Sequence, residues 1–202
     1  MKFIIFHGAF GNPEENWFPY LKKELQNIEQ EVLVPKFPVE NWDDITEKGP
    51  DIPARKQTLN NWFKVFSKLE KSIKSKDKLC FIAHSLSPIF ILHALEKLSI
   101  QLDSAIFVCP FLRELKKSWQ IDHVNSTFYK TNFNFKKLRK LIPISYTLYS
   151  DNDPYVDPKY AIEFADKLGS SKIIVKGAGH MNKEAGFVKL PLVYELCRTR
   201  LI

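Results

Sequence analysis

The amino-acid sequence predicts an α/β fold, in which a single domain holds a mainly parallel sheet with helices on both faces. Short apolar runs alternate along the chain with segments of helical periodicity, and this alternation is typical of parallel sheets. A length of 202 residues suits one domain with one sizeable core. No internal repeat, low-complexity tract or linker divides the sequence. We therefore expect residues 1–202 to form one domain.

The first half of the chain is expected to supply three strands and three helices. In the expected helices apolar residues recur every three or four positions, as at Leu59, Trp62 and Phe66. The connection over residues 36–53 contains three prolines and is expected to be irregular. Strands are expected at residues 2–6, 31–35 and 78–83, and helices at residues 17–28, at residues 59–73 and directly after residue 85.

The second half continues the alternation, with one exception. Residues 111–142 are rich in aromatic and lysine residues but have no strong period. We interpret this segment as a small insertion near the active site described below, rather than as part of the scaffold. Strands are expected at residues 104–109, 145–149 and 172–175, and helices at residues 159–168 and 191–200.

The central motif is an apolar strand that runs into an apolar helix with only His84, Ser85 and Leu86 between them. Such a connection has to turn sharply, which exposes the side chain at the turn beyond the carboxyl end of the strand. The flanking residues Ala83 and Ser87 are small, as close packing of the helix on the strand requires. This arrangement predicts that Ser85 is a nucleophile at a strand–helix elbow.

A serine nucleophile needs a base, and the base needs an acid to orient it. In a parallel sheet we expect both in loops after later strands. The loop after residues 145–149 offers Asp153 as the acid, with Asp151 and Asp157 as alternatives. The loop after residues 172–175 offers His180 as the base.

An oxyanion hole requires two backbone N–H groups. The residue after the nucleophile, Leu86, is expected to supply one of them at the start of the buried helix. The loop after the first strand is expected to supply the other, from Ala9 or alternatively from Phe10. Aromatic residues near this site are candidate substrate-binding residues for an apolar acyl or aryl group, with core packing as the alternative interpretation: Phe10, Phe111, Trp119 and Tyr155.

Other classes of function have weaker support. The net charge of +7 suggests a nucleic-acid partner, but Lys64, Lys68 and Lys71 lie on the polar side of an expected helix, where a solvated face explains them. We therefore expect no nucleic-acid partner. No metal-ligand spacing, phosphate loop or dinucleotide signature is present, so no cofactor is expected.

The sequence also predicts a cytoplasmic protein. The apolar run over residues 1–6 is too short for the core of a signal peptide, and no apolar run is long enough to span a bilayer. The three cysteines are widely spaced within apolar segments, which favours buried free thiols in a reducing compartment.

These motifs resemble those of a known family. Similar blocks lie at residues 7–8, 17–25, 34–38, 83–87, 109–110, 133–138, 149–156 and 176–182. They identify the chain as similar to the RBBP/YdeN-type small serine hydrolases, a compact branch with the α/β-hydrolase fold. The resemblance implies a triad at Ser85, Asp153 and His180 and no large lid. In two places this sequence departs from the family, with Ser87 followed by Pro88 where the elbow usually has glycine, and Ala178 where glycine is common.

Together these observations predict a serine hydrolase. It would cleave carboxylic esters or related acyl bonds of a small-molecule substrate through an acyl-enzyme intermediate. The alternative is a protein-binding module on the same scaffold, with an idle or weakly active triad, because a fold does not by itself determine a function.

Overall fold

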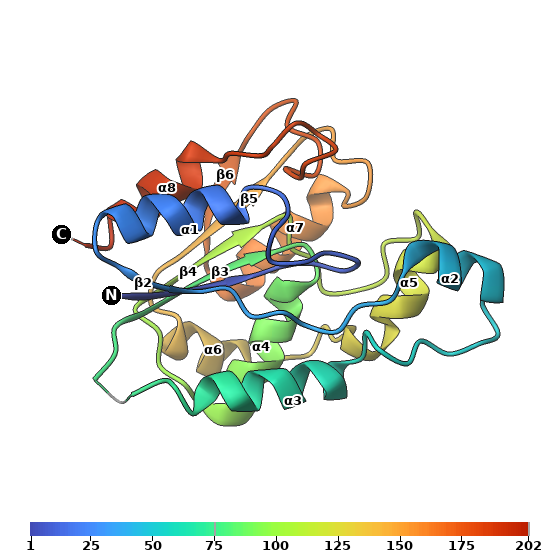
Figure 1. Cartoon of the computed structure of the whole chain (residues 1–202), viewed down its shortest axis with the longest axis horizontal. Coiled ribbons are helices and arrows are strands. Elements are labelled where there is room, and N and C mark those ends of the chain that lie inside the picture. The colour runs from blue at the N-terminus through green and yellow to red at the C-terminus, as the bar shows by residue number, and fades with distance from the viewer. Residues whose placement is uncertain (75, 202) are drawn as a thin grey trace.

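Six parallel strands form the central sheet of the structure, a computed structural model that describes residues 1–74 and 76–201 (Figure 1). Their order across the sheet is β2-β1-β3-β4-β5-β6. Because neighbouring strands all pair in parallel, the loops that follow them meet at one edge. The strands are β1 (Lys2–Phe6), β2 (Glu31–Leu33), β3 (Leu79–His84), β4 (Ser104–Val108), β5 (Ser145–Tyr149) and β6 (Ser171–Ile174).

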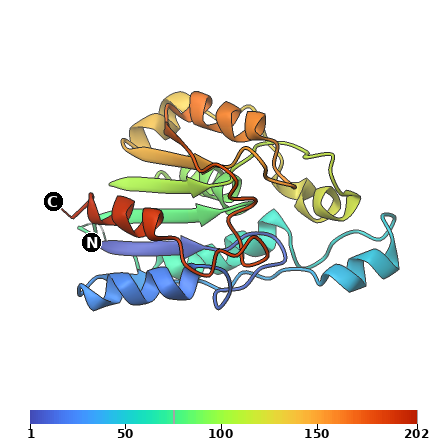
Figure 2. The same cartoon turned by 90° about the horizontal axis from the view of Figure 1, so that it is seen from above.

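Helices cover both faces of this sheet, which confirms the predicted fold class (Figure 1). One face carries α1 (Phe18–Asn27) and α8 (Pro191–Arg198). The other face carries α3 (Leu59–Glu70), α4 (Ser87–Leu98), α6 (Phe135–Leu141) and α7 (Pro158–Leu168). Two short helices, α2 (Trp42–Lys48) and α5 (Trp119–Asn125), contact each other beyond the carboxyl ends of the strands, and a 3-10 turn over Ser126–Phe128 follows α5 (Figure 2).

The core has two layers, one on each face of the sheet. Side chains along β1 alternate between them, with Phe3 and Ile5 in the layer under α1 and α8 and Ile4 and Phe6 in the other. All four are fully buried, as expected for a strand inside a parallel sheet with two covered faces. Burial of each such side chain contributes about 1.5–3 kcal/mol.

The helix after Ser85 is buried almost all round, as its composition predicts. Eight of the twelve residues of α4 are buried. Pro88 lies in its first turn, where a missing backbone N–H costs nothing because those groups have no partner within the helix. The departure from glycine in this part of the elbow is therefore compatible with helix formation.

The prediction that residues 36–53 are irregular is wrong, because they contain α2. Asn41 caps this helix through a hydrogen bond from the Asp44 N–H to its side chain, 3.0 Å long. Asp43 and Asp44 lie in the first turn, where their negative charges interact favourably with the positive end of the helix dipole. Ile45 is the one buried residue of the helix, so the sequence has no apolar period there.

Residues 111–142 contain regular structure that the sequence did not reveal. They form α5 and α6, which begin at side-chain caps from Ser118 and Asn134. The strands and longer helices lie within a few residues of their predicted limits. None of the helices in residues 1–74 and 76–201 is long and apolar enough to cross a membrane.

Candidate active site

Ser85 sits at the sharp turn between β3 and α4. Its φ of 61° lies in the left-handed region, which is uncommon for a residue with a side chain and is often found at functional sites. The Ser85 N–H donates to the Val108 carbonyl at the end of β4, 2.9 Å away. The adjacent strand therefore holds the turn in place from the backbone side.

The structure brings Ser85, His180 and Asp153 together in one hydrogen-bonded chain. Ser85 Oγ lies 3.0 Å from His180 Nε2, and His180 Nδ1 lies 2.7 Å from Asp153 Oδ2. An ionised carboxylate can only accept, so Nδ1 carries the proton and donates it to Asp153. In the neutral imidazole Nε2 is then an acceptor directed at the serine hydroxyl.

Asp153 has an environment that favours its ionised form. Its Oδ1 accepts the backbone N–H groups of Tyr155 and Val156 at 2.9 and 3.0 Å. Burial acts to raise the pKa of Asp153, but the hydrogen bond and charge of His180 and the two N–H groups outweigh it, so this pKa is lowered. The alternative acids lie elsewhere, because Asp157 caps α7 and Asp151 binds the N–H of Gly177 at 2.7 Å.

Two loops are joined directly behind the histidine. We call residues 150–157 the acid loop and residues 176–182 the histidine loop. Side chains of the acid loop accept three consecutive N–H groups of the histidine loop. These pairs are Asp151 with Gly177 at 2.7 Å, Ser150 with Ala178 at 2.9 Å and Asn152 with Gly179 at 2.7 Å. With Asp153 on His180, four consecutive acid-loop residues thus hold four consecutive histidine-loop residues.

The carbonyl side of the histidine loop is held from the opposite direction. His84 Nε2 donates to the His180 carbonyl, and Trp17 Nε1 donates to the Met181 carbonyl, both at 2.9 Å. Burial lowers the pKa of His84 to about 3, so its imidazole is neutral at neutral pH. Sequence patterns do not indicate these two supports, because each joins residues far apart in the chain.

The backbone N–H groups expected at the oxyanion hole differ in their partners. Among the described residues, neither the Ala9 N–H nor the Leu86 N–H donates a hydrogen bond within the protein, so both are available to a substrate oxygen. The Phe10 N–H instead donates to Gln57 Oε1 at 3.2 Å. Of the two alternatives in this loop, Ala9 is therefore the one whose N–H has no protein partner among the described residues.

The loop that carries Ala9 is fixed by a buried histidine. His7 Nε2 accepts the Phe37 N–H at 3.0 Å, and its Nδ1 donates to the Gly8 carbonyl at 2.9 Å. Burial lowers the pKa of His7 to about 4, which keeps the ring neutral. The Ser87 hydroxyl donates to the His7 carbonyl. The serine that replaces the usual elbow glycine thus ties the start of α4 to this loop.

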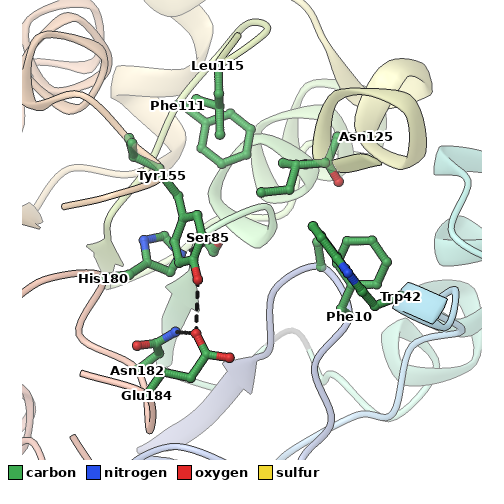
Figure 3. Close-up of a pocket in the computed structure, with 13 residues that line it drawn as sticks. Phe10, Trp42, Ser85, Phe111, Leu115, Asn125, Tyr155, His180, Asn182 and Glu184 are labelled. Atoms are coloured by element: carbon green, nitrogen blue, oxygen red, sulfur yellow. Dashed lines mark hydrogen bonds between the residues drawn. The ribbon is translucent and has the colours of Figure 1, made fainter. Parts of the chain in front are cut away.

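A cavity of about 370 Å³ opens beside Ser85 (Figure 3). Three of the four predicted substrate-binding residues line it, and Phe10 and Trp42 lie across the opening from Tyr155. Trp119 does not line it; this residue is 40% exposed, and its ring faces His123. The cavity is lined by Ala9, Phe10, Trp42, Ser85, Phe111, Leu115, Ile121, Asn125, Tyr155, Val156, His180, Asn182 and Glu184.

A second, more polar cavity of about 240 Å³ adjoins the first one. Both include Ser85 and His180, and the smaller one adds Glu15, Asn16 and Lys183. Glu184 lies on both, and its Oε2 accepts the Tyr155 hydroxyl at 3.0 Å (Figure 3). Ser85 thus stands between an aromatic chamber and a polar one.

One group of potential metal ligands lies in the part of the chain that the structure describes. His84, Cys109 and His180 offer ligand atoms within 4.8 Å of one another. Burial and the nearby Asp153 raise the pKa of the Cys109 thiol well above its usual value, and a thiol must lose its proton to bind a metal. Both ring nitrogens of His180 are engaged with Ser85 and Asp153. The chemistry of these three side chains therefore does not fit a metal site, and His84 instead holds the backbone of His180 by a hydrogen bond.

Comparisons with known proteins bear on the family and the fold of the chain. The model of the serine hydrolase family matches residues 3–199. Bacillus subtilis YdeN is 24% identical over 95% of this chain and 92% of its own length. The crystal structure of YdeN has a TM-score of 0.82 and 22% identity, covering 99% of this chain and 98% of that one. A structure from the metagenome-derived lipolytic enzymes LipS and LipT has a TM-score of 0.69 and 12% identity, covering 98% and 91% of the two chains.

Proposed function

This chain belongs to the serine hydrolase family, and from that membership we propose that it hydrolyses carboxylic esters or related acyl bonds through an acyl-enzyme on Ser85. The observation that carries the proposal is the hydrogen-bonded chain from Asp153 through His180 to Ser85, with distances of 2.7 and 3.0 Å. A serine hydroxyl is a weak nucleophile, and this arrangement is the one that activates it.

Each group has one role in the proposed reaction. His180 Nε2 takes the proton of Ser85 while Oγ attacks the carbonyl carbon, and the same nitrogen then protonates the leaving group. Asp153 holds the imidazole in the required tautomer and stabilises its cationic form. The N–H groups of Ala9 and Leu86 bind the oxyanion. Water then releases the acyl group by the same steps, with His180 as its base.

The two cavities support a substrate with an apolar and a polar end. Phe10, Trp42 and Phe111 give the larger cavity an aromatic lining, which suits an apolar acyl or aryl group. The smaller cavity, with Glu15 and Lys183, suits a polar leaving group. The likeness in fold to a lipolytic enzyme is consistent with an ester substrate. In this proposal residues 111–142 are a small insertion that forms one wall of the acyl chamber.

The proposed substrate is a small molecule, and the proposed location is the cytoplasm. Three free, buried cysteines are consistent with a reducing compartment. We propose no nucleic-acid partner, because the positive charge is spread over the chain.

A fluorophosphonate probe tests the central claim, because it reacts with activated serines. We expect the wild-type protein to be labelled near pH 8, and Ser85→Ala to fold, by circular dichroism, without labelling. A panel of p-nitrophenyl esters of increasing acyl length then measures the acyl preference, which should favour apolar chains. Folded wild-type protein that resists the probe would favour the alternative of a non-catalytic protein-binding module on this scaffold.

A further inference from the structure

Gln57 is a fully buried amide that joins two distant parts of the site. It lies just before α3 and is 0% exposed. Its Oε1 accepts the Phe10 N–H at 3.2 Å, and its Nε2 donates to Asn125 Oδ1 at 2.8 Å. Asn125, the last residue of α5, is itself buried and lines the 370 Å³ cavity. One side chain therefore links the loop of Ala9 to the wall of the acyl chamber.

The direction of this hydrogen-bonded chain is fixed by its first member. A backbone N–H can only donate, so the carbonyl oxygen of Gln57 has to face Phe10. The amide nitrogen of Gln57 then faces Asn125, whose oxygen accepts it. Neither amide can be turned over without placing two donors or two acceptors together, which is costly in a buried site. The chain thus has a single low-energy arrangement.

This row of hydrogen bonds ends at a strained point of the backbone. Phe10 has a φ of 54°, a conformation that residues with a side chain adopt only when their surroundings impose it. The hydrogen bond from its N–H to Gln57 is such a constraint. It also leaves the adjacent Ala9 N–H as the donor without a protein partner in this part of the described chain.

Gln57 is well anchored for such a role. On one side, Glu40 accepts the N–H groups of Arg55 and Lys56, the first of them at 2.6 Å. On the other side, Thr127 Oγ1 accepts the Leu59 N–H at 2.9 Å. The backbone around Gln57 is thus held before and after this residue, so its side chain can impose a position on Phe10 rather than follow it.

We propose that Gln57 is a positioning residue of the oxyanion hole, anchored by Asn125. It fixes Phe10 in the left-handed conformation and thereby directs the Ala9 N–H at the developing oxyanion. This inference rests on the proposed hydrolase function.

The test compares Gln57→Leu with the wild-type protein on a short-chain p-nitrophenyl ester. We expect kcat to fall by about ten- to a hundredfold, because a misplaced donor loses most of its contribution, while KM changes by less than about threefold because a short acyl chain makes few contacts with the chamber lining. An alkyl trifluoromethyl ketone, which forms a tetrahedral adduct on the serine, should lose affinity by the same factor as kcat/KM. Gln57→Glu keeps an acceptor for the Phe10 N–H and should recover part of both losses.

Thr147→Val is the control. It removes a different buried side-chain hydrogen bond, from Thr147 Oγ1 to Ser170 Oγ at 2.9 Å, which touches neither Phe10 nor the backbone around Gln57, so kcat and ketone affinity should stay within about twofold of wild type. If Gln57→Leu does not fold, Asn125→Leu decides, because it removes the anchor and should weaken ketone binding.

Three results would overturn the proposal. The first is a folded Gln57→Leu protein with wild-type kcat and ketone affinity. The second is an Asn125→Leu protein with unchanged ketone affinity when Gln57→Leu cannot be obtained. The third is wild-type protein that is inert to the fluorophosphonate probe, which removes the hydrolase proposal as well, whereas the first two leave it standing.

Discussion

Gly8 lies so close to Ser85 that a β-carbon on Gly8 would be 2.8 Å from the β-carbon of Ser85. The same added atom would be 3.2 Å from the His84 carbonyl oxygen and 3.3 Å from Ser85 Oγ. Real β-carbons do not approach so closely, and the nearest atoms belong to the tightly held elbow. Only glycine therefore allows the loop of Ala9 to pass beside the nucleophile.

We predict that Gly8→Ala impairs catalysis much more than folding. The added methyl group would push the loop and the elbow apart, and a displacement of about 1 Å can cost a hundredfold in rate. Steady-state kinetics should show kcat/KM lower by about that factor. Gly11→Ala is the control, since its added β-carbon would come no closer than 3.4 Å to any neighbour. Equal activities of the two variants would contradict the prediction.

Asp153→Asn is predicted to reduce kcat by about four powers of ten while the protein still folds, because an amide favours the wrong tautomer of His180. Asp151→Asn should be nearly neutral, because an asparagine oxygen can still accept the Gly177 N–H. Ester turnover and circular dichroism of both variants provide the measurement. A severe loss in Asp151→Asn together with a mild one in Asp153→Asn would show that the acid is misassigned.

Trp42 and Trp119 form a natural pair for testing the acyl chamber. Their exposed fractions are nearly equal, at 42% and 40%, but only Trp42 lines the cavity, with its ring 5.2 Å from that of Phe10. Trp42→Ala should raise KM for a long-chain or aryl ester by about tenfold, a loss of roughly 1.4 kcal/mol of binding. Trp119→Ala should change it by less than about twofold, and the opposite order would restore Trp119 as the substrate contact.

Acid should destabilise the fold before it protonates the buried carboxylate. The pKa of His7 is about 4 and that of His84 about 3 in the folded protein, against about 6.5 for an exposed histidine. Between these values the unfolded chain binds more protons, so stability is full above pH 6.5 and falls as the pH decreases toward 4. The pKa of Asp153 is lowered in the folded protein, so its ionised form stabilises the fold. This stabilisation is lost only as the pH falls below the pKa of an unfolded aspartate, about 3.9.

Urea unfolding at several pH values between 7.5 and 5 measures this effect. We expect the free energy of unfolding to fall by on the order of 1 kcal/mol per pH unit below pH 6.5. His7→Gln should be less stable at pH 7.5 and have a shallower slope, because one of the buried histidines with a lowered pKa is gone. Parallel profiles for the wild type and His7→Gln would show that His7 does not titrate in this window.

Parts of the structure with dense local patterns were predictable from sequence. The long apolar stretch of α4 and the short apolar strands give the correct fold class, and the family resemblance is confirmed. By contrast, α2 buries only Ile45 and α6 only Leu138. A seven-residue helix with one buried side chain has no period to read. The caps at Asn41 and Asn134 were the available signals.

Site residues were likewise predictable where they follow a local pattern and not where they depend on tertiary packing. The chain order of Ser85, Asp153 and His180 could be read because each follows a recognisable strand, and their roles remain predictions. Which of Trp42 and Trp119 faces the cavity could not be read, because the answer depends on how α2 and α5 dock beyond the sheet. Gln57 was missed for the same reason, since its partners lie 47 and 68 residues away.

The hydrogen bonds between the acid loop and the histidine loop have a consequence for how such a site can change. Residues 177–179 donate their N–H groups to side chains of residues 150–152, so neither loop is complete without the other. Replacing the acid loop alone would leave those three N–H donors without partners and weaken the positioning of His180, even if an aspartate were kept at position 153. The two loops are therefore structurally interdependent. A design that places this histidine in another scaffold has to include both loops together.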